Sequence, residues 1–239
     1  MQSRKIEYTQ DETRYVGELF WDETRGGRRP GVVVFPEAFG LNEHARERAR
    51  RLAKLGYVAF AADPHGDGKV YDDMASLGPA MQGLFGDRAR WRSLARAALD
   101  TLAAQPEVDS DILASIGFCF GGATCLELAR SGAPLKAITT FHAGLLPEQE
   151  GDAGNIAASV LICHGAEDPL LQKETIDAVK GEFRRDKVDW QFIYYGNAVH
   201  SFTDPEADGR GMSGLAYDAR TEARSWLAMS NFFDETLVQ

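Results

Sequence analysis

The sequence has few of the residues that mark a disulfide-bonded, membrane-spanning or secreted protein. Only three of its 239 residues are cysteines, Cys119, Cys125 and Cys163, and no two of them are close together. This odd number argues against a disulfide framework and against a zinc site. No apolar run is long enough to span a bilayer, and the first ten residues lack the apolar segment of a signal peptide. We therefore expect a cytoplasmic protein.

Positive charge is also scarce, since 26 lysines and arginines face 36 aspartates and glutamates for a net charge of −10. Such a balance disfavours nucleic-acid and anionic-membrane partners. We expect a small-molecule substrate instead, and a monomer or homodimer. The composition is ordinary for a globular protein, with 44% apolar and 26% charged residues. The length suits one large domain over residues 1–239.

Strand-like and helix-like segments alternate along most of the chain. Two alternating segments, Ile6–Thr9 and Tyr15–Trp21, predict an antiparallel pair of edge strands. Continuous apolar runs typical of covered parallel strands follow, separated by amphipathic segments typical of helices. This pattern predicts one doubly wound, mostly parallel sheet with helices on both faces, a three-layer sandwich. The predicted parallel strands are Gly31–Phe35, Tyr57–Ala61, Ile112–Ile116, Ala137–Phe141, Val160–Gly165 and Val188–Tyr194. The predicted helices are Glu43–Leu55, Val70–Phe85, Arg88–Ala104, Cys119–Arg130, Lys173–Arg184 and Leu215–Glu235.

The segment Gly117–Gly122 carries a cysteine between glycines, in the form G-x-C-x-G. A strand precedes it and a helix follows, which is the arrangement of the nucleophile elbow in α/β-hydrolases, with Cys119 in place of the usual serine. The glycines are needed because side chains there would collide with the neighbouring strand and helix. A sulfur at a helix N-terminus is also favoured as a thiolate.

Three other polar residues, Glu37, Asp168 and His200, follow the carboxyl ends of predicted strands, where ligands bind in such sheets. The order Cys119, Asp168, His200 is that of nucleophile, acid and histidine in α/β-hydrolases. His200 would take the thiol proton, and Asp168 would hold the imidazole in the correct tautomer. The N–H groups of Phe120 and Ala38 would stabilise the oxyanion. The alternatives are a turn role for Asp168, a loop role for His200 and a solvated turn role for Glu37.

Other residues compete for roles at the same site. His142 is the second choice for the base, because it ends a strand next to the elbow strand and would line the pocket. Candidates for the pocket wall are Phe39, Tyr71, Trp91, Phe120 and Phe202, with core packing an equal or better interpretation for Trp91. The cluster of Asp63 and His65 suggests a metal site only weakly, and turn chemistry explains it better.

Four motifs together resemble the dienelactone hydrolase family. They are Gly-Phe-Cys-Phe-Gly-Gly at 117–122, His-Gly-Ala-Glu-Asp-Pro at 164–169, His-Ser-Phe at 200–202 and Pro-Glu-Ala-Phe-Gly at 36–40. The resemblance runs from about Gly31 to the last predicted helix. It implies a triad of Cys119, His200 and Asp168 that cleaves esters or lactones without a metal or organic cofactor. It also implies that Glu37 interacts with the cysteine in the resting enzyme and helps to control its ionisation.

One position departs from the family pattern. Dienelactone-cleaving members carry a carboxylate-binding arginine four residues after the catalytic histidine, where this chain has Asp204. An aspartate repels a carboxylate, so dienelactone itself is a doubtful substrate although the reaction type is not. Lys69, Arg88 or Arg210 could supply a replacement cation.

We therefore predict a cysteine-dependent hydrolase of small esters or lactones that forms an acyl-enzyme. A thioesterase or peptidase using the same triad is one alternative. The other is a non-catalytic redox-sensing or binding protein in which Cys119 is oxidised.

Overall fold

The computed structural model describes residues 1–237, and these divide into two compact units, Met1–Ile116 and Gly117 onward. The prediction of a single domain over residues 1–239 stays a prediction. In the described part no helix is both long and apolar enough to cross a membrane.

The first unit begins with an antiparallel pair, as predicted, and continues with parallel strands. Its strands hydrogen-bond in the order β1-β2-β4-β3-β5, and β2 pairs antiparallel with both β1 and β4. The prediction that β2 is an edge strand is therefore wrong, and its buried residues, such as Leu19 and Phe20, explain why it lies inside the sheet. The strands are β1 (Gln2–Gln10), β2 (Thr13–Trp21), β3 (Arg29–Phe35), β4 (Val58–Ala61) and β5 (Val108–Phe118), the last of which ends in the second unit.

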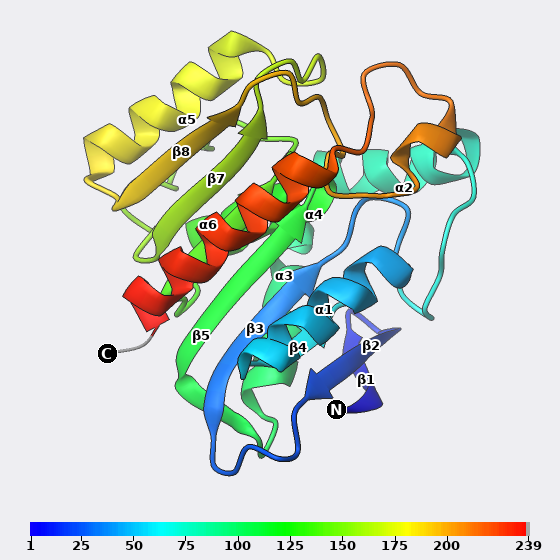
Figure 1. Ribbon diagram of the computed structural model, residues 1–239, viewed down its shortest axis with the longest axis vertical. Helices are drawn as coiled ribbons and strands as arrows, with labels where there is room; N and C mark the ends of the chain where they lie inside the picture. The colour runs from blue at the N-terminus through cyan, green and yellow to red at the C-terminus, as the bar shows by residue number, and fades with distance from the viewer. Residues whose placement is uncertain (238–239) are drawn as a thin grey trace. The chain divides into compact units, whose positions relative to one another are not determined.

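Three helices belong to the first unit, and two of them cover opposite faces of its strands (Figure 1). Helix α1 (Glu43–Leu55) packs on β2, β3 and β4, and α3 (Arg88–Ala103) packs on β1, β3 and β4 from behind. Asn42 caps α1, and Gly56 ends it in the left-handed conformation that glycine adopts readily. Helix α2 (Met74–Gly86) contains Pro79, and its main helical contact is with α3.

The second unit holds parallel strands in the order β5-β6-β7-β8, where β5 contributes its last residues. They are β6 (Ala137–Phe141), β7 (Ser159–Gly165) and β8 (Trp190–Tyr195). Strands β6 and β7 are almost completely buried, which explains their uninterrupted apolar sequence. Strand β5 starts four residues earlier than predicted, because Asp109, Ser110 and Asp111 hid its beginning.

The helices of the second unit also lie on both faces of its strands (Figure 1). Helix α6 packs on β6 and β7 in front, and α4 packs on β6 from behind. The elements are α4 (Phe120–Arg130), α5 (Lys173–Asp186), the short 3-10 helix η1 (Ala207–Arg210) and α6 (Ala219–Leu237).

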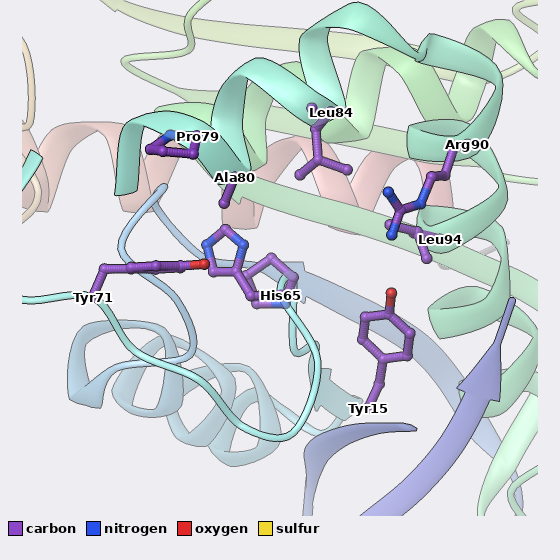
Figure 2. A pocket seen from close by; sticks show the side chains of 10 residues that line it. Tyr15, His65, Tyr71, Pro79, Ala80, Leu84, Arg90 and Leu94 are labelled. Atoms are coloured by element: carbon purple, nitrogen blue, oxygen red, sulfur yellow. The ribbon is translucent and has the colours of Figure 1, made fainter. Parts of the chain in front are cut away.

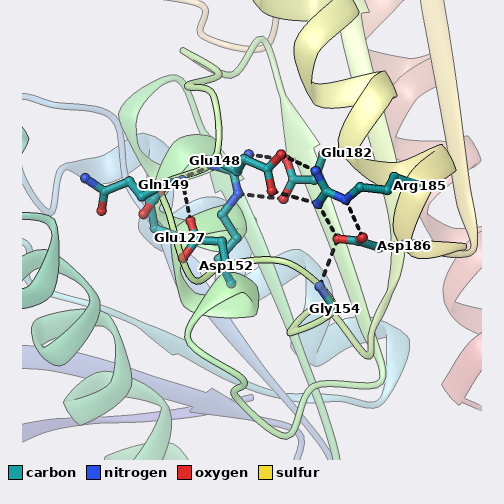
Figure 3. Close-up of polar contacts among 9 residues, drawn as sticks. Glu127, Glu148, Gln149, Asp152, Gly154, Glu182, Arg185 and Asp186 are labelled. Carbon is teal, nitrogen blue, oxygen red and sulfur yellow. Dashed lines mark hydrogen bonds and ion pairs between the residues drawn. The ribbon is translucent and has the colours of Figure 1, made fainter.

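A group of charged side chains joins α4 to α5 in this unit (Figure 3). The Arg130 guanidinium donates from Nε to Glu182 Oε1 at 2.9 Å and from Nη1 to Glu127 Oε1 at 2.8 Å. The three side chains are at most 1% exposed. Buried charges must be paired, so this cluster fixes the two helices against each other.

Candidate active site

The elbow predicted around Cys119 is present, and its backbone is strained. Cys119 has a φ of +52°, a conformation that side chains other than glycine rarely adopt. A Cβ on Gly117 would lie 2.0 Å from the Gly121 carbonyl oxygen, and one on Gly122 would lie 2.5 Å from the Cβ of Ala143. The glycines therefore permit the sharp turn between β5 and α4, as the sequence predicts.

Hydrogen bonds to neighbouring backbone hold this turn in place. The Cys119 N–H donates to the Phe141 carbonyl at 3.1 Å, and the Cys119 carbonyl accepts from Gly122 and Gly144, each at 3.1 Å. The cysteine is only partly buried, at the start of α4. Strain that surrounding structure over-determines in this way is typical of functional sites.

The other two cysteines lie in a different environment. Cys125 and Cys163 are both fully buried. Burial raises the pKa of the Cys163 thiol to about 12, although contact with the Tyr195 hydroxyl lowers it. A thiol of that kind is inert at neutral pH, so Cys119 is the one cysteine of the chain suited to nucleophilic chemistry.

Asp168 and His200 meet as a buried pair. The His200 Nδ1–H donates to Asp168 Oδ2 at 2.7 Å, and the side chains are 3% and 0% exposed respectively. The second carboxylate oxygen, Oδ1, accepts the Leu170 N–H at 2.9 Å. This arrangement fixes one tautomer of the imidazole and leaves Nε2 for other chemistry.

Backbone contacts bring the loops of this acid and this histidine together. The Glu167 N–H donates to the Ala198 carbonyl at 2.9 Å, and the Ala216 N–H donates to the His200 carbonyl at 3.1 Å. A Cβ on Gly165 would lie 2.6 Å from the Ala198 carbonyl oxygen, so only glycine allows this approach.

The electrostatics of His200 link it to Cys119. Burial is the largest single influence and lowers the pKa of His200. The charge of Cys119 and the bond to Asp168 outweigh it and raise this pKa to about 10. Among residues 1–237, Nε2 of His200 is buried and forms no well-aligned hydrogen bond. An imidazole nitrogen beside a thiol suggests proton transfer between the two groups.

His142 supports the same region from the side. Its ring lies edge-on to the His200 ring with centroids 5.2 Å apart, and its Nε2 is 2.7 Å from the Thr203 hydroxyl oxygen. It is completely buried and has a φ of +38°. Sequence reasoning did not single out Thr203, whose place three residues after His200 was the only signal available.

The remaining predicted residues of this unit are also placed. Phe120 and Phe202 are buried, and the Phe202 ring packs edge-on to His142 at 5.0 Å. Asp204 is 1% exposed and forms an ion pair with Arg210 at 2.5 Å. Arg210 therefore neutralises Asp204, which reduces the repulsion that Asp204 would exert on an anion.

Glu37, Ala38 and Phe39 lie in the first unit, directly after β3. Glu37 is 2% exposed. The Ala38 carbonyl accepts a hydrogen bond from His65 Nε2 at 2.6 Å, and the Phe39 carbonyl accepts from the Tyr71 N–H at 2.8 Å. The loop is therefore fixed by the segment after β4.

Two further expectations concern the first unit. Trp91 is 2% exposed and packs edge-on to Phe85 at 5.4 Å, which favours the core interpretation. The Asp63 carboxylate accepts backbone N–H bonds from His65 and Gly66, each at 3.0 Å, so it makes a turn as predicted. No group of three or more His, Cys, Asp or Glu among residues 1–237 is arranged to hold a metal ion.

Comparison with known proteins adds independent evidence. Residues 19–237 match the model of the dienelactone hydrolase family. A protein of Yersinia pestis provisionally named a carboxymethylenebutenolidase is 30% identical over 87% of this chain and 79% of its own.

Two solved structures are much more similar. A structure named m3DLH is 72% identical with a TM-score of 0.97, covering 99% of this chain and 98% of that one. A dienelactone hydrolase-like promiscuous phosphotriesterase from metagenomic libraries is 67% identical with a TM-score of 0.97, covering 98% of each chain. The chain therefore belongs to the dienelactone hydrolase family and is a hydrolase with the α/β-hydrolase fold.

Proposed function

We propose that the protein hydrolyses small carboxylic esters or lactones through Cys119, His200 and Asp168. The observation that carries this proposal is the buried His200 ring. Its Nδ1 bonds Asp168, and the charge of Cys119 raises its pKa. The names of the relatives support the same substrate class, because carboxymethylenebutenolidase acts on a lactone. A structural ion pair would not require a partly exposed thiol on a strained turn.

In the proposed reaction Cys119 gives its proton to His200 when substrate binds, and the raised pKa of His200 favours the imidazolium that forms. Cys119 Sγ attacks the carbonyl carbon, and the carbonyl π electrons move to oxygen. Collapse of this intermediate breaks the bond to the leaving oxygen, which takes the proton from His200 Nε2. Water, deprotonated by His200, then attacks the thioester, and the carboxylic acid leaves as Sγ recovers its electrons.

The oxyanion would be stabilised by the N–H groups of Phe120 and Ala38, as expected of such an elbow and its partner loop. We further propose that Glu37 restrains thiolate formation in the resting enzyme. Glu37 is only 2% exposed, which supports a functional role, because a buried carboxylate affects the ionisation of nearby groups strongly. Replacement with glutamine should change the dependence of thiol alkylation on pH, and an unchanged profile would contradict this role.

A phosphotriester is a second candidate substrate. The relative described as a promiscuous phosphotriesterase is 67% identical over nearly the whole chain. The same thiolate would attack phosphorus, and the leaving group would depart as an alkoxide or phenoxide. Thioesters and amides are also possible substrates of the same triad, but no relative named here supports them.

Replacement of Cys119 with alanine tests the proposal. Activity on a p-nitrophenyl ester and on a lactone should fall roughly 1,000-fold or more. Cys119→Ser would retain a trace, and Cys125→Ser, a change at a buried thiol, is the matched control. Near-full activity of Cys119→Ala would overturn the assignment.

Mass spectrometry separates chemistry from binding. Intact protein exposed briefly to the ester should gain the acyl mass on Cys119. Thioester, amide and phosphotriester substrates in the same assay rank the alternatives. Turnover of none of them, combined with peroxide-sensitive Cys119, would favour a redox sensor instead.

Location and assembly complete the proposal. We keep the predictions of a cytoplasmic location, of a monomer or homodimer, and of no nucleic-acid or membrane partner. Cell fractionation and light scattering measure the first two directly.

A further inference from the structure

A cavity of about 190 Å³ lies within the first unit, between α2, α3, β2 and the loop after β4 (Figure 2). The proposed hydrolysis assigns no role to this cavity. An engineered cavity of about 150 Å³ in another protein holds benzene, so this one has room for a single six-membered ring with a small substituent. It is lined by Tyr15, Pro64, His65, Tyr71, Pro79, Ala80, Gly83, Leu84, Arg90 and Leu94.

One end of the cavity carries a phenol and a guanidinium. Tyr15 is 2% exposed, and its hydroxyl points into the cavity toward Arg90 and Leu94 (Figure 2). Burial raises the pKa of Tyr15, and the adjacent Arg90 guanidinium lowers it. The two groups together offer one hydroxyl and several N–H donors to the same point, which suits a carboxylate.

Arg90 is exposed to solvent, and its guanidinium hydrogen-bonds the Tyr15 hydroxyl. No ion pair joins it to a carboxylate among residues 1–237, although Arg96 on the same helix pairs with Asp100. The nearby carboxylate of Asp63 is already occupied, since it accepts the backbone N–H groups of Val16 and Gly68 on one oxygen and of His65 on the other. Asp63 raises the pKa of Tyr15 through its charge but is held by these backbone donors, so within residues 1–237 no carboxylate is paired with Arg90.

The other end of the cavity is aromatic. The His65 and Tyr71 rings are perpendicular with centroids 4.9 Å apart. Burial lowers the pKa of His65, so its ring is uncharged at neutral pH. Lys69 Nζ lies 4.4 Å from the centre of the Tyr71 ring and adds positive charge to this side. Aromatic edges of this kind favour a flat ring as their neighbour.

Helix α2 forms the apolar wall and provides a route of entry. Pro79, Ala80 and Leu84 line the cavity from this helix (Figure 2). The helix holds four glycines or prolines in its interior and last turn, and only α3 makes extensive contact with it among the described helices and strands. A loosely packed wall can yield to an incoming ligand.

We propose that this cavity is a binding site for a small aromatic carboxylate, such as one of benzoate size. Its carboxylate pairs with Arg90 and accepts the Tyr15 hydroxyl, while its ring lies between the α2 wall and the rings of His65 and Tyr71. The proposal does not depend on the chemistry of Cys119.

Calorimetric titration with benzoate tests this site on the full-length protein. Arg90→Gln should weaken binding at least about tenfold, because a charge-assisted hydrogen bond is lost. Tyr15→Phe should weaken it roughly three- to tenfold. Arg96→Gln, an exposed arginine on the same helix, is the matched control and should change the affinity by less than about twofold. Thermal unfolding verifies that each variant is folded.

Neutral probes and a blocked nucleophile sharpen the test. Benzamide should bind at least about tenfold more weakly than benzoate, and Cys119→Ser should bind benzoate as tightly as the native protein does. The proposal is overturned if the native protein does not bind benzoate, if Arg90→Gln binds it unchanged, or if Cys119→Ser alone abolishes binding. The last result would assign the acid to the nucleophile instead, without contradicting the proposed hydrolysis.

Discussion

Two buried groups of charged side chains in the second unit differ in one respect. The cluster of Arg130, Glu127 and Glu182 satisfies its charges internally, and its guanidinium donates to both carboxylates. The pair of Asp168 and His200 is buried as deeply, but Nε2 of its imidazole has no well-aligned partner within residues 1–237.

The difference separates structure from chemistry. Pairing outweighs burial and raises the pKa of Arg130, so that residue stays charged at every accessible pH and can only hold helices together. His200 combines a fixed tautomer with an open nitrogen and a strained neighbour at Cys119. A buried charged group with an unused hydrogen-bonding atom therefore points to function, and one whose hydrogen bonds are all made points to stability.

The largest expected effect is on activity, from Asp168→Asn. The amide cannot accept the Nδ1–H in the same way or stabilise an imidazolium, so the ring adopts the wrong tautomer. We expect kcat/KM for an ester to fall roughly 1,000-fold or more with little loss of structure. Steady-state kinetics measure this change, and circular dichroism provides the folding control. A decrease of less than tenfold would mean that Asp168 is merely a turn residue.

A comparable effect on stability is expected from Arg130→Met. The change leaves two buried carboxylates without a cation and should lower the free energy of unfolding by about 3–5 kcal/mol. Arg185→Met, at an arginine that pairs with Glu148 and Asp186 near the surface (Figure 3), should cost only about 0–1 kcal/mol. Urea denaturation measures both. Equal losses would remove the distinction between the buried and exposed pairs.

The pH dependence of stability probes His200 itself. Its pKa rises from an ordinary value of about 6.5 in the unfolded chain to about 10 in the folded protein. The contribution of the imidazolium is thus fully present below about pH 6.5 and is lost as the pH rises through about 10. The loss should be smaller than that of Arg130→Met, because a neutral ring keeps its bond to Asp168.

Urea denaturation between pH 6 and 10 measures this decline. His200→Gln cannot titrate and serves as the reference, so the slope of interest is the difference between the two proteins. Parallel curves would show that the protonation of His200 does not contribute to folding.

The smallest effect is expected from Thr203→Val. This change keeps the shape but removes the hydroxyl that bonds His142 Nε2. We expect kcat to fall roughly fivefold, equivalent to about 1 kcal/mol, together with a shifted pH profile, because the ring beside His200 is released. Thr203→Ser, which keeps a hydroxyl, should have the kcat and the pH profile of the native protein. Reduced stability with an unchanged pH profile would assign a purely structural role to Thr203.

Sequence reasoning located most elements because their signals are local. Asn42 and Gly56 mark the ends of α1, and the glycines at Gly117 and Gly122 mark the elbow, so each was predicted within its segment. The start of β5 was missed because polar residues there interrupt the apolar pattern. The interior position of β2 was missed because its pairing with β4 joins segments about 40 residues apart in sequence.

The sequence alone determined the alternation of strands and helices, the turn at Cys119 and the positions of Asp168 and His200 after predicted strands, because backbone sterics and hydrophobic periodicity act over a few residues. Only the tertiary structure decided that Arg210 neutralises Asp204, that Thr203 bonds His142, and that Tyr15 and Arg90 meet in one cavity. Most of those contacts join residues that are far apart in the sequence, and all of them form only when the chain packs, so no local sequence pattern predicts them.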